Sequence, residues 1–278
     1  MLDIASGALQ GDYRALLPVL AFSLMAVEFA TARLLGHHHT HSLAETASSL
    51  TIAVVHKLLR PLEAAVLAIP LAALYQNRLF DIDHASALNV VVLLFAVEFC
   101  YYWHHRTAHH VRWFWASHAV HHSPTKLNYT AAVRLSWFGP ITGNILFYMP
   151  LIWLGFHPLA VIAVLGINLI YQFFIHTELS PRWGPLEWVL NTPHHHQVHH
   201  ASNPECLDKN FGGILIIYDR IFGTFAPRPA QPLRYGLVEG PQTQNPVWIN
   251  GHVWWRMGNE FCRSKNWRGR LQALFGRP

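Results

Sequence analysis

Long apolar stretches, separated by short polar segments, constrain the fold of this chain more than any other feature of its sequence. A helix needs roughly 20 mostly apolar residues to cross about 30 Å of hydrocarbon. Residues 18–35 reach that length once they are extended back to Arg14. Over the whole chain, 52% of the residues are hydrophobic and only 13% are charged, which is too apolar for an ordinary soluble domain of 278 residues. We therefore expect an integral membrane protein.

The second apolar stretch, residues 49–75, is less regular than the first. Charged residues interrupt its first half, and Pro61 and Pro70 would bend a helix that contained them. We therefore expect the membrane span over residues 61–75, preceded by a flanking helix at the membrane interface.

Two later stretches complete the predicted membrane part. Residues 85–103 carry one charge, Glu98, and end in Tyr-Tyr-Trp, a cluster that is typical of the membrane-water boundary. Residues 141–154 and 159–175 are apolar arms joined by a short turn, which predicts a helical hairpin that dips into or crosses the bilayer. The predicted fold class is an all-α, integral membrane helical bundle, with about four spans or with three spans plus a re-entrant hairpin.

Histidine is the most unusual residue of the chain, because 21 histidines outnumber the 20 lysines and arginines together. Most of the histidines after the third apolar stretch fall into boxes with a spacing of three or four residues, which places them on one face of a helix. We expect the three histidines of the H-x-x-H-H box at His118 to present their rings to one point. The boxes are His105 and His109, then His118, His121 and His122, and finally His196, His199 and His200.

These boxes predict metal binding. Neutral imidazoles make poor core residues and repel one another once protonated, so a shared cation is the natural compensation. Eight or more nitrogen donors exceed what one first-row ion accepts, which indicates two ions. The cysteines Cys100, Cys206 and Cys262 show no CxxC spacing and give no sign of a thiolate site. An all-imidazole set suits zinc, iron, copper or nickel, and ligand type alone does not choose between them.

The order of spans places all boxes on one side of the membrane. An odd number of crossings precedes His104, and the hairpin returns the chain to the same side at His176. Of the 20 Lys and Arg residues, only Arg14, Arg33, Lys57, Arg60 and Arg78 precede Trp103. The positive-inside rule therefore predicts a cytoplasmic, histidine-rich di-metal cap. The basic residues are dispersed, so the net charge of +5 does not indicate nucleic-acid binding.

We expect a single membrane domain over residues 1–278, without internal repeats. Residues 14–103 would form the N-terminal spans, and residues 104–225 the catalytic region with the membrane hairpin at 139–176. Residues 226–278 would form a C-terminal cytoplasmic tail.

The sequence from Glu98 to about Phe225 resembles the fatty acid hydroxylase and sterol desaturase superfamily. The resemblance rests on H-x-x-x-H, H-x-x-H-H and a second H-x-x-H-H that follows a membrane hairpin. Flanking stretches resemble the alkylglycerol monooxygenases and their bacterial relatives within it. They are Tyr-Tyr-Trp-His-His-Arg from Tyr101, Gly-Pro-Leu-Glu-Trp from Gly184 and Asp-Lys-Asn-Phe-Gly-Gly from Asp208.

This resemblance implies an O2-dependent, non-haem di-iron oxidoreductase that hydroxylates or desaturates a C–H bond of a lipid such as a fatty acid, sterol or ether lipid. It implies an external electron donor, either a separate electron-transfer protein or a small reductant, for which a tetrahydropterin is one candidate. The implied location is the bacterial inner membrane, with the active site on the cytoplasmic face. The iron ligands that it implies are His105, His109, His118, His121, His122, His176, His195, His196, His199 and His200.

Several polar residues near the boxes are candidates for orienting the ligands. Glu98 lies seven residues before His105, on the same helix face, and would accept a proton from a ligand imidazole or instead pair with an arginine or with water. Asn128, Asn191, Asp208 and Asn210 would orient ligands or act as caps and turn residues.

Three other classes of protein fit the sequence less well. A zinc-dependent membrane hydrolase would need a carboxylate base beside the histidines, as in H-E-x-x-H, and none lies within the boxes. In a metal-binding transporter, the histidines should line a path through the spans instead of collecting at one end. A bis-histidine haem protein would place single histidines on opposed helices. The zinc hydrolase and the transporter stay as the alternatives to the oxygenase.

Overall fold

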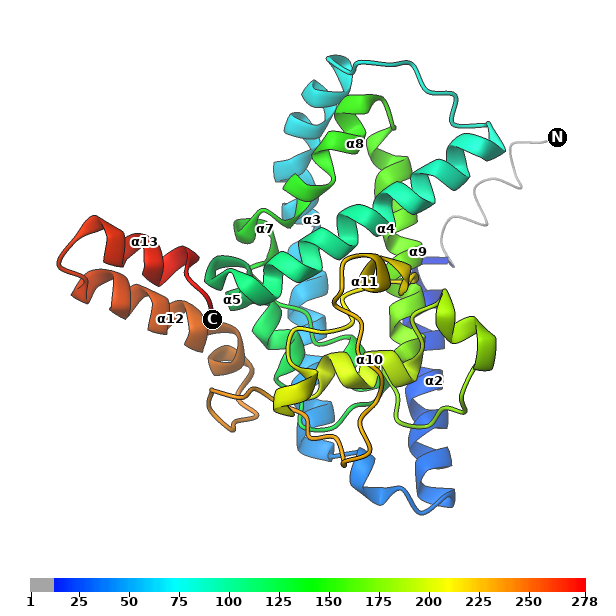
Figure 1. Cartoon of the computed structure of the whole chain (residues 1–278), viewed down its shortest axis with the longest axis vertical. Coiled ribbons are helices and arrows are strands. Elements are labelled where there is room, and N and C mark those ends of the chain that lie inside the picture. Colours follow the sequence, from blue (N-terminus) through cyan, green and yellow to red (C-terminus); the bar gives the residue numbers. More distant parts are fainter. Residues whose placement is uncertain (1–12) are drawn as a thin grey trace.

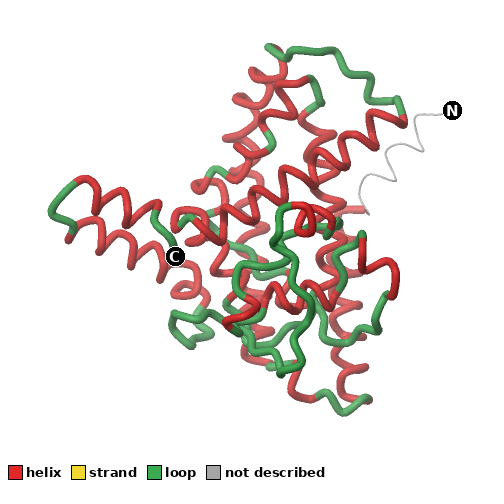
Figure 2. Tube along the Cα trace, in the orientation of Figure 1, coloured by secondary structure: helices red, strands yellow, loops and turns green. Residues whose placement is uncertain are grey.

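The computed structural model describes residues 13–278, and four long apolar helices form its bundle (Figure 1). They are α2 (Tyr13–Leu34), α3 (Leu43–Gln76), α4 (Ala87–His110) and α9 (Pro158–Ile175). Within the described residues, these four are long and apolar enough to cross a membrane. Figure 2 shows that helices and loops, without a strand, make up this part of the chain. The prediction of an all-helical fold is confirmed, and the four helices are candidate membrane spans.

The structure differs from the sequence prediction at α3. A single helix of 34 residues contains both Pro61 and Pro70, where we expected an interfacial helix followed by a separate span. A break in this helix would leave backbone N–H and C=O groups unpaired in hydrocarbon, at a cost of several kcal/mol per group. Continuity of the helix is therefore the less costly solution, even with two prolines.

The core of the membrane part lies where four helices meet. Leu71 of α3, Val97 of α4, Ile152 of α8 (Met149–Leu154) and Val161 of α9 are all buried in one cluster. Apolar side chains of the same helices that face outward are exposed, as expected for residues that contact lipid.

The predicted hairpin is present, but its first arm is broken into α7 (Gly139–Thr142), η2 (Asn144–Phe147) and α8. Gly155 ends this arm with a φ of 126° and lies so close to the carbonyl of Phe80 that a Cβ atom there would clash. The backbone N–H of Leu79 donates to the carbonyl of Trp153 (2.8 Å). The hairpin therefore turns against the loop that joins α3 to α4.

α3 and α9 share this end of the bundle and run in opposite directions, with the rings of Tyr75 and His157 in contact at 4.9 Å. Along α9, His176 lies 19 positions after His157. Along α3, His56 lies 19 positions before Tyr75. Either path covers about 28 Å at about 1.5 Å per residue, which is close to the thickness of the hydrocarbon core. His56 and His176 therefore lie near the opposite boundary of the membrane.

The remaining helices gather at that boundary and carry most of the histidine boxes. α12 and α13 belong to the predicted tail but form an ordered hairpin, in which Val253 and Met257 pack against Ala116 and Ala119 of α5. These helices are η1 (His38–Thr40), α5 (Arg112–His122), α6 (Tyr129–Ala132), η3 (Gly184–Trp188), α10 (Pro193–His200), η4 (Pro204–Cys206), α11 (Ile217–Ile221), α12 (Pro246–Arg263) and α13 (Trp267–Phe275).

Candidate metal centre

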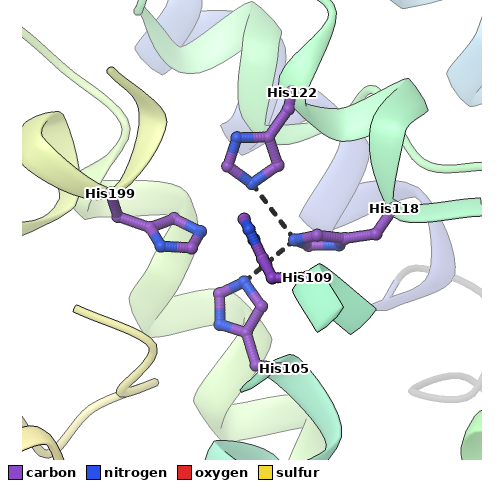
Figure 3. A group of neighbouring side chains, drawn as sticks. All are labelled: His105, His109, His118, His122 and His199. Atoms are coloured by element: carbon purple, nitrogen blue, oxygen red, sulfur yellow. Dashed lines mark hydrogen bonds between the residues drawn. The ribbon is translucent and has the colours of Figure 1, made fainter. Parts of the chain in front are cut away.

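A sharp turn between α4 and α5 brings the first two histidine boxes together. Val111 separates the two helices with an extended backbone (φ −125°, ψ 118°), so that α5 folds back against α4. Figure 3 shows five imidazoles that converge there, and one ring nitrogen from each lies within 4.8 Å of the others. The first histidine group consists of His105, His109, His118, His122 and His199.

A second histidine group consists of His121 from α5, His176 from the end of α9, and His196 and His200 from α10. All four residues are buried, and one ring nitrogen of each again lies within 4.8 Å of the others. Together the two groups contain nine of the ten residues that the sequence predicts as ligands.

Each H-x-x-H-H box is divided between the two groups. His118 and His122 belong to the first group but His121 to the second, so the expectation that these three converge on one point is wrong. The third box is divided in the opposite sense, because His196 and His200 belong to the second group. Residues four apart lie on one helix face, whereas adjacent residues point about 100° apart, because a turn contains about 3.6 residues.

Backbone carbonyls orient three of the rings. The Nδ1 atoms of His105, His176 and His199 lie 2.8, 2.6 and 2.9 Å from the carbonyl oxygens of Phe211, Gln172 and Lys209. A carbonyl oxygen only accepts hydrogen bonds, so each Nδ1 carries the proton and each Nε2 of the neutral ring keeps a free lone pair. Metal-binding histidines are commonly held in this way.

The free lone pairs converge. The Nε2 atom of His176 lies 3.0 Å from Nε2 of His121 and 2.9 Å from Nε2 of His196. The buried Nε2 atoms of His109 and His199 have no hydrogen-bond partner among the residues that the structure describes. A buried polar nitrogen without a partner is costly. A cation bound in each group would accept the lone pairs of its ring nitrogens and so satisfy them. The nine imidazoles therefore fit a pair of first-row metal ions.

The protonation of the rings agrees with this arrangement. Burial lowers the pKa of His176 to about 4. Burial, followed by the neighbouring imidazoles, lowers the pKa of His118, His122 and His200 well below the ordinary 6.5. These rings are therefore neutral at pH 7, which is the form that binds metal.

A loop after α10 supplies the carbonyl that orients His105. The buried carboxylate of Asp219 accepts hydrogen bonds from the backbone N–H groups of Phe211 (2.8 Å) and Gly212 (2.7 Å). The side-chain amide of Asn191 donates to the carbonyl of Gly212 (2.6 Å). The predicted residue Asn191 thus acts on the loop instead of touching a ligand.

Glu98 has neither of the roles expected from the sequence. It is 1% exposed and contacts no imidazole and no arginine within residues 13–278. Its carboxylate accepts hydrogen bonds from the backbone N–H groups of Ile214 (2.8 Å) and Leu215 (3.0 Å) and from the amide of Asn168. Glu98 therefore ties the loop that follows Gly212 to α4 and α9.

The other predicted polar residues lie at different distances from the centre. Asp208 is the nearest, with a carboxylate oxygen 3.7 Å from Nδ1 of His109. Asn210 donates to the carbonyl of His195 (3.1 Å), and Asn128 caps α6 and donates to the carbonyl of Thr40 (2.8 Å). His195 lies outside both groups, and its Nδ1 accepts a hydrogen bond from the N–H of Thr192 (3.4 Å) at the start of α10.

The sequence prediction missed a polar ladder inside α9. Asn168 and Gln172 are buried, hydrogen-bonded to each other, and continue through the Gln172 carbonyl to His176. Tyr101 donates to the side chain of Gln172 (2.8 Å). The signal was present in the sequence, because polar residues recur at every fourth position of an otherwise apolar span.

A large cavity reaches the candidate centre from the membrane part. Its volume is about 1130 Å³, and α3, α4 and α9 supply most of its largely apolar lining. His105 and His118 of the first group and His121 and His176 of the second form part of its wall. A molecule that fills the cavity would therefore contact both groups.

A second, smaller cavity of about 370 Å³ lies on the other side of the candidate centre. His109, His122 and His199 of the first group line it, together with charged side chains that include Asp208 and Arg256. The two cavities have no lining residue in common, so the histidine groups separate them.

Comparison with known proteins assigns this arrangement to a family. Residues 90–224, which contain all nine histidines of the two groups, match the family model described as "Fatty acid hydroxylase". The chain belongs to the fatty acid hydroxylase superfamily. No solved structure matches the chain.

Curated relatives of this superfamily include lipid hydroxylases and monooxygenases. Alkylglycerol monooxygenase of Homo sapiens is 36% identical over 258 residues, which cover 92% of this chain and 57% of that protein. The Danio rerio enzyme of the same name is 49% identical over 154 residues (55% and 34%). Ornithine lipid hydroxylase OlsE of Rhizobium tropici is 32% identical over 173 residues (61% and 52%). The chain therefore spans about half the length of the relatives that it matches.

Proposed function

We propose that this protein is a membrane oxygenase, in which two iron ions bound by the two histidine groups use O2 to hydroxylate or desaturate a C–H bond of a lipid. The observation that carries the proposal is the position of His105, His118, His121 and His176 in the wall of a largely apolar, lipid-sized cavity. Superfamily membership and the lipid-modifying relatives support it. A zinc hydrolase is less suited to this site, because the nearby carboxylate Asp208 faces the second cavity.

The bound iron pair would supply the redox chemistry that couples reduction of O2 to oxidation of the lipid. The protein holds the nine imidazoles neutral and aimed inward, with Nδ1–H groups anchored on the carbonyls of Phe211, Gln172 and Lys209. The apolar lining of the larger cavity positions the lipid chain and excludes water. Hydroxylation of one C–H bond by O2 requires two external electrons and two protons, and one oxygen atom leaves as water.

The second cavity is the proposed route for those electrons. It reaches His109, His122 and His199 from the side opposite the lipid, and charged side chains, among them Asp208, Glu239 and Arg256, form part of its wall. A small reductant or an electron-transfer protein would therefore reach the centre while the lipid stays in place.

We place the histidine side of the membrane in the cytoplasm. Most Lys and Arg residues follow α4 and lie in segments at the histidine end of the bundle. Lys57 and Arg60 lie near the same boundary, as judged from the length of α3. The positive-inside rule then gives the orientation, with the inner membrane of a bacterium as the proposed location.

The test is metal analysis of detergent-purified protein from iron-supplemented cells, with Mössbauer spectroscopy on the same sample. About two irons per chain, in a coupled pair, are expected from the number of imidazoles. The sample is then given reductant, O2 and a panel of fatty acids, sterols and ether lipids, and O2-dependent products are measured. Zinc alone, retained under iron supplementation and without O2 uptake, would overturn the proposal.

A further inference from the structure

Two basic residues of α3 face the larger cavity. Lys57 and Arg60 are on its wall, together with Glu63, which accepts a hydrogen bond from Arg60 (3.2 Å). The Arg60 side chain is 58% exposed, so this part of the wall lies at the rim of the cavity. Lys57 is exposed and makes no ion pair or hydrogen bond with any residue from 13 to 278. The rim therefore carries one cation more than its carboxylate neutralises.

The position of these cations matches a membrane boundary. Lys57 precedes Tyr75 by 18 positions, or about 27 Å of helix, and Tyr75 lies at the opposite end of the bundle beside His157. Beyond that end, the polar loop with Arg78 and Asp81 begins. Charged residues within apolar helices are costly and commonly mark substrate pathways. At this depth a lipid places its head group, not its hydrocarbon chain.

Between the rim and the far end, α3 presents small side chains to the cavity. Ala64, Ala68 and Ala72 recur at every fourth position and lie on its wall. From the facing helix α9, Leu165 and Leu169 complete an apolar channel. The channel fits an extended hydrocarbon chain that runs along α3 away from the rim.

The rim and the candidate metal centre lie toward the same end of this channel. His56, next to Lys57, contacts the carbonyl of Ser136 through Nδ1 (3.0 Å), and both residues line the cavity with His121. The length of α9 places His176 at the same depth as His56. A head group at the rim would therefore leave the first part of the chain beside the histidines.

We propose that Lys57 and Arg60 bind the negatively charged head group of the lipid, a phosphate or a carboxylate, and so select anionic lipids. This inference rests on the proposed function, because it assigns the substrate class of the same cavity. Lys57 supplies the unpaired charge, and Arg60 adds N–H donors suited to oxyanions. The arrangement also places the oxidised carbon near the head group instead of at the chain end.

The test compares binding of three lipids with the same 16-carbon chain: hexadecyl phosphate, hexadecanoic acid and neutral hexadecanol. Each displaces a fluorescent fatty alcohol from purified protein in an uncharged detergent. The unaltered protein is expected to prefer the anionic lipids by about tenfold, equivalent to about 1.4 kcal/mol. The double variant Lys57→Gln/Arg60→Gln is expected to bind all three alike.

Two further variants make the result specific. Arg78→Gln removes a cation from the loop beyond the far end of α3, outside the cavity, and is expected to keep the preference. Lys57→Arg keeps the positive charge and is also expected to keep the preference for anionic lipids. It tests the rim if the double variant folds poorly. Equal binding by the unaltered protein, or equal loss in Arg78→Gln, would overturn the inference.

Inorganic phosphate separates a lipid head-group site from a site for the free ion. It is expected not to displace the probe at millimolar concentration, and displacement as strong as that by hexadecyl phosphate would overturn the lipid assignment. The binding assay needs neither iron nor turnover. A retained anionic preference without O2-dependent products would therefore contradict the oxygenase proposal alone, and turnover without the preference would contradict the head-group inference alone.

Discussion

The Nδ1 atom of His105 lies 2.8 Å from the carbonyl oxygen of Phe211, so a residue more than a hundred positions away in sequence fixes the tautomer of a candidate ligand. The Phe211 backbone is itself held by a side chain, because its N–H donates to the carboxylate of Asp219 (2.8 Å). This chain of contacts connects the first histidine group to a buried carboxylate that does not touch a metal site.

Asp219→Asn is expected to weaken metal binding in the first group. The amide nitrogen of asparagine would face the backbone N–H of either Phe211 or Gly212. That N–H group would then lose its hydrogen-bond acceptor. Loss of such support around a ligand typically lowers metal affinity about 10- to 100-fold. Metal retained per chain after dialysis against a graded chelator measures the effect. Unchanged retention would show that the loop does not orient His105.

His121→Ala and His199→Ala are expected to impair different sites. His121 belongs to the second group and His199 to the first, so each variant is expected to retain roughly one metal ion per chain and to lose oxidation activity. His195→Ala is the matched control from the same helix as His199, since His195 lies outside both groups. Elemental analysis of the three variants checks this, and loss of metal from His195→Ala would contradict the division into two groups.

Glu98→Gln is expected to lower the free energy of unfolding by about 1–3 kcal/mol, because one buried acceptor position becomes a donor. The carboxylate accepts from the N–H groups of Ile214 and Leu215 and from Asn168 in the protein interior. Glu63→Gln, at the rim of the cavity, is the control and is expected to change stability by much less. Thermal unfolding in detergent measures both, and equal effects would argue against a structural role for Glu98.

The metal-free protein is expected to lose stability as the pH falls from about 6.5 toward 4. Burial lowers the pKa of His176 to about 4 and that of His118 and His200 well below 6.5. In this window the unfolded chain binds more protons than the folded chain, so acid favours unfolding. Bound metal competes with these protons and should reduce the pH dependence. Thermal midpoints with and without metal, between pH 4.5 and 7.5, test this, and identical midpoints in metal-free protein would contradict it.

Ala68→Phe is expected to block the larger cavity without disturbing the candidate metal centre. Ala68 lies on the cavity wall, midway along the channel of small residues, and a phenyl ring there would occupy the space of the lipid chain. Lipid binding is expected to fall at least about tenfold, or about 1.4 kcal/mol, with metal content unchanged. Ala65→Phe is the control, because Ala65 is exposed on the same helix and does not line the cavity. Equal effects of both substitutions would point to general destabilisation.

The local pattern of the sequence determined which segments are helical and which residues are candidate ligands. Apolar runs predicted α2 and α4 as spans and α9 as an arm of a hairpin, and the spacing of three or four residues placed the histidines on helix faces. Both signals depend only on neighbours in the chain, so they can be read before any contact is known. The continuous course of α3 through Pro61 and Pro70 was not predicted, because it depends on the environment of the helix.

Only the tertiary structure decided how the histidines divide and what holds them. Adjacent His121 and His122 enter different groups because they point about 100° apart and each meets partners from other helices. The carbonyls of Phe211 and Lys209 are orienting groups that no side-chain pattern reveals, since every residue has a carbonyl. Glu98 looked like a ligand partner from its helix face, yet the approach of Ile214 and Leu215 gave it another role. Helical periodicity fixes the direction of each side chain around its own helix axis. The partners that the side chain meets depend on how several helices pack together.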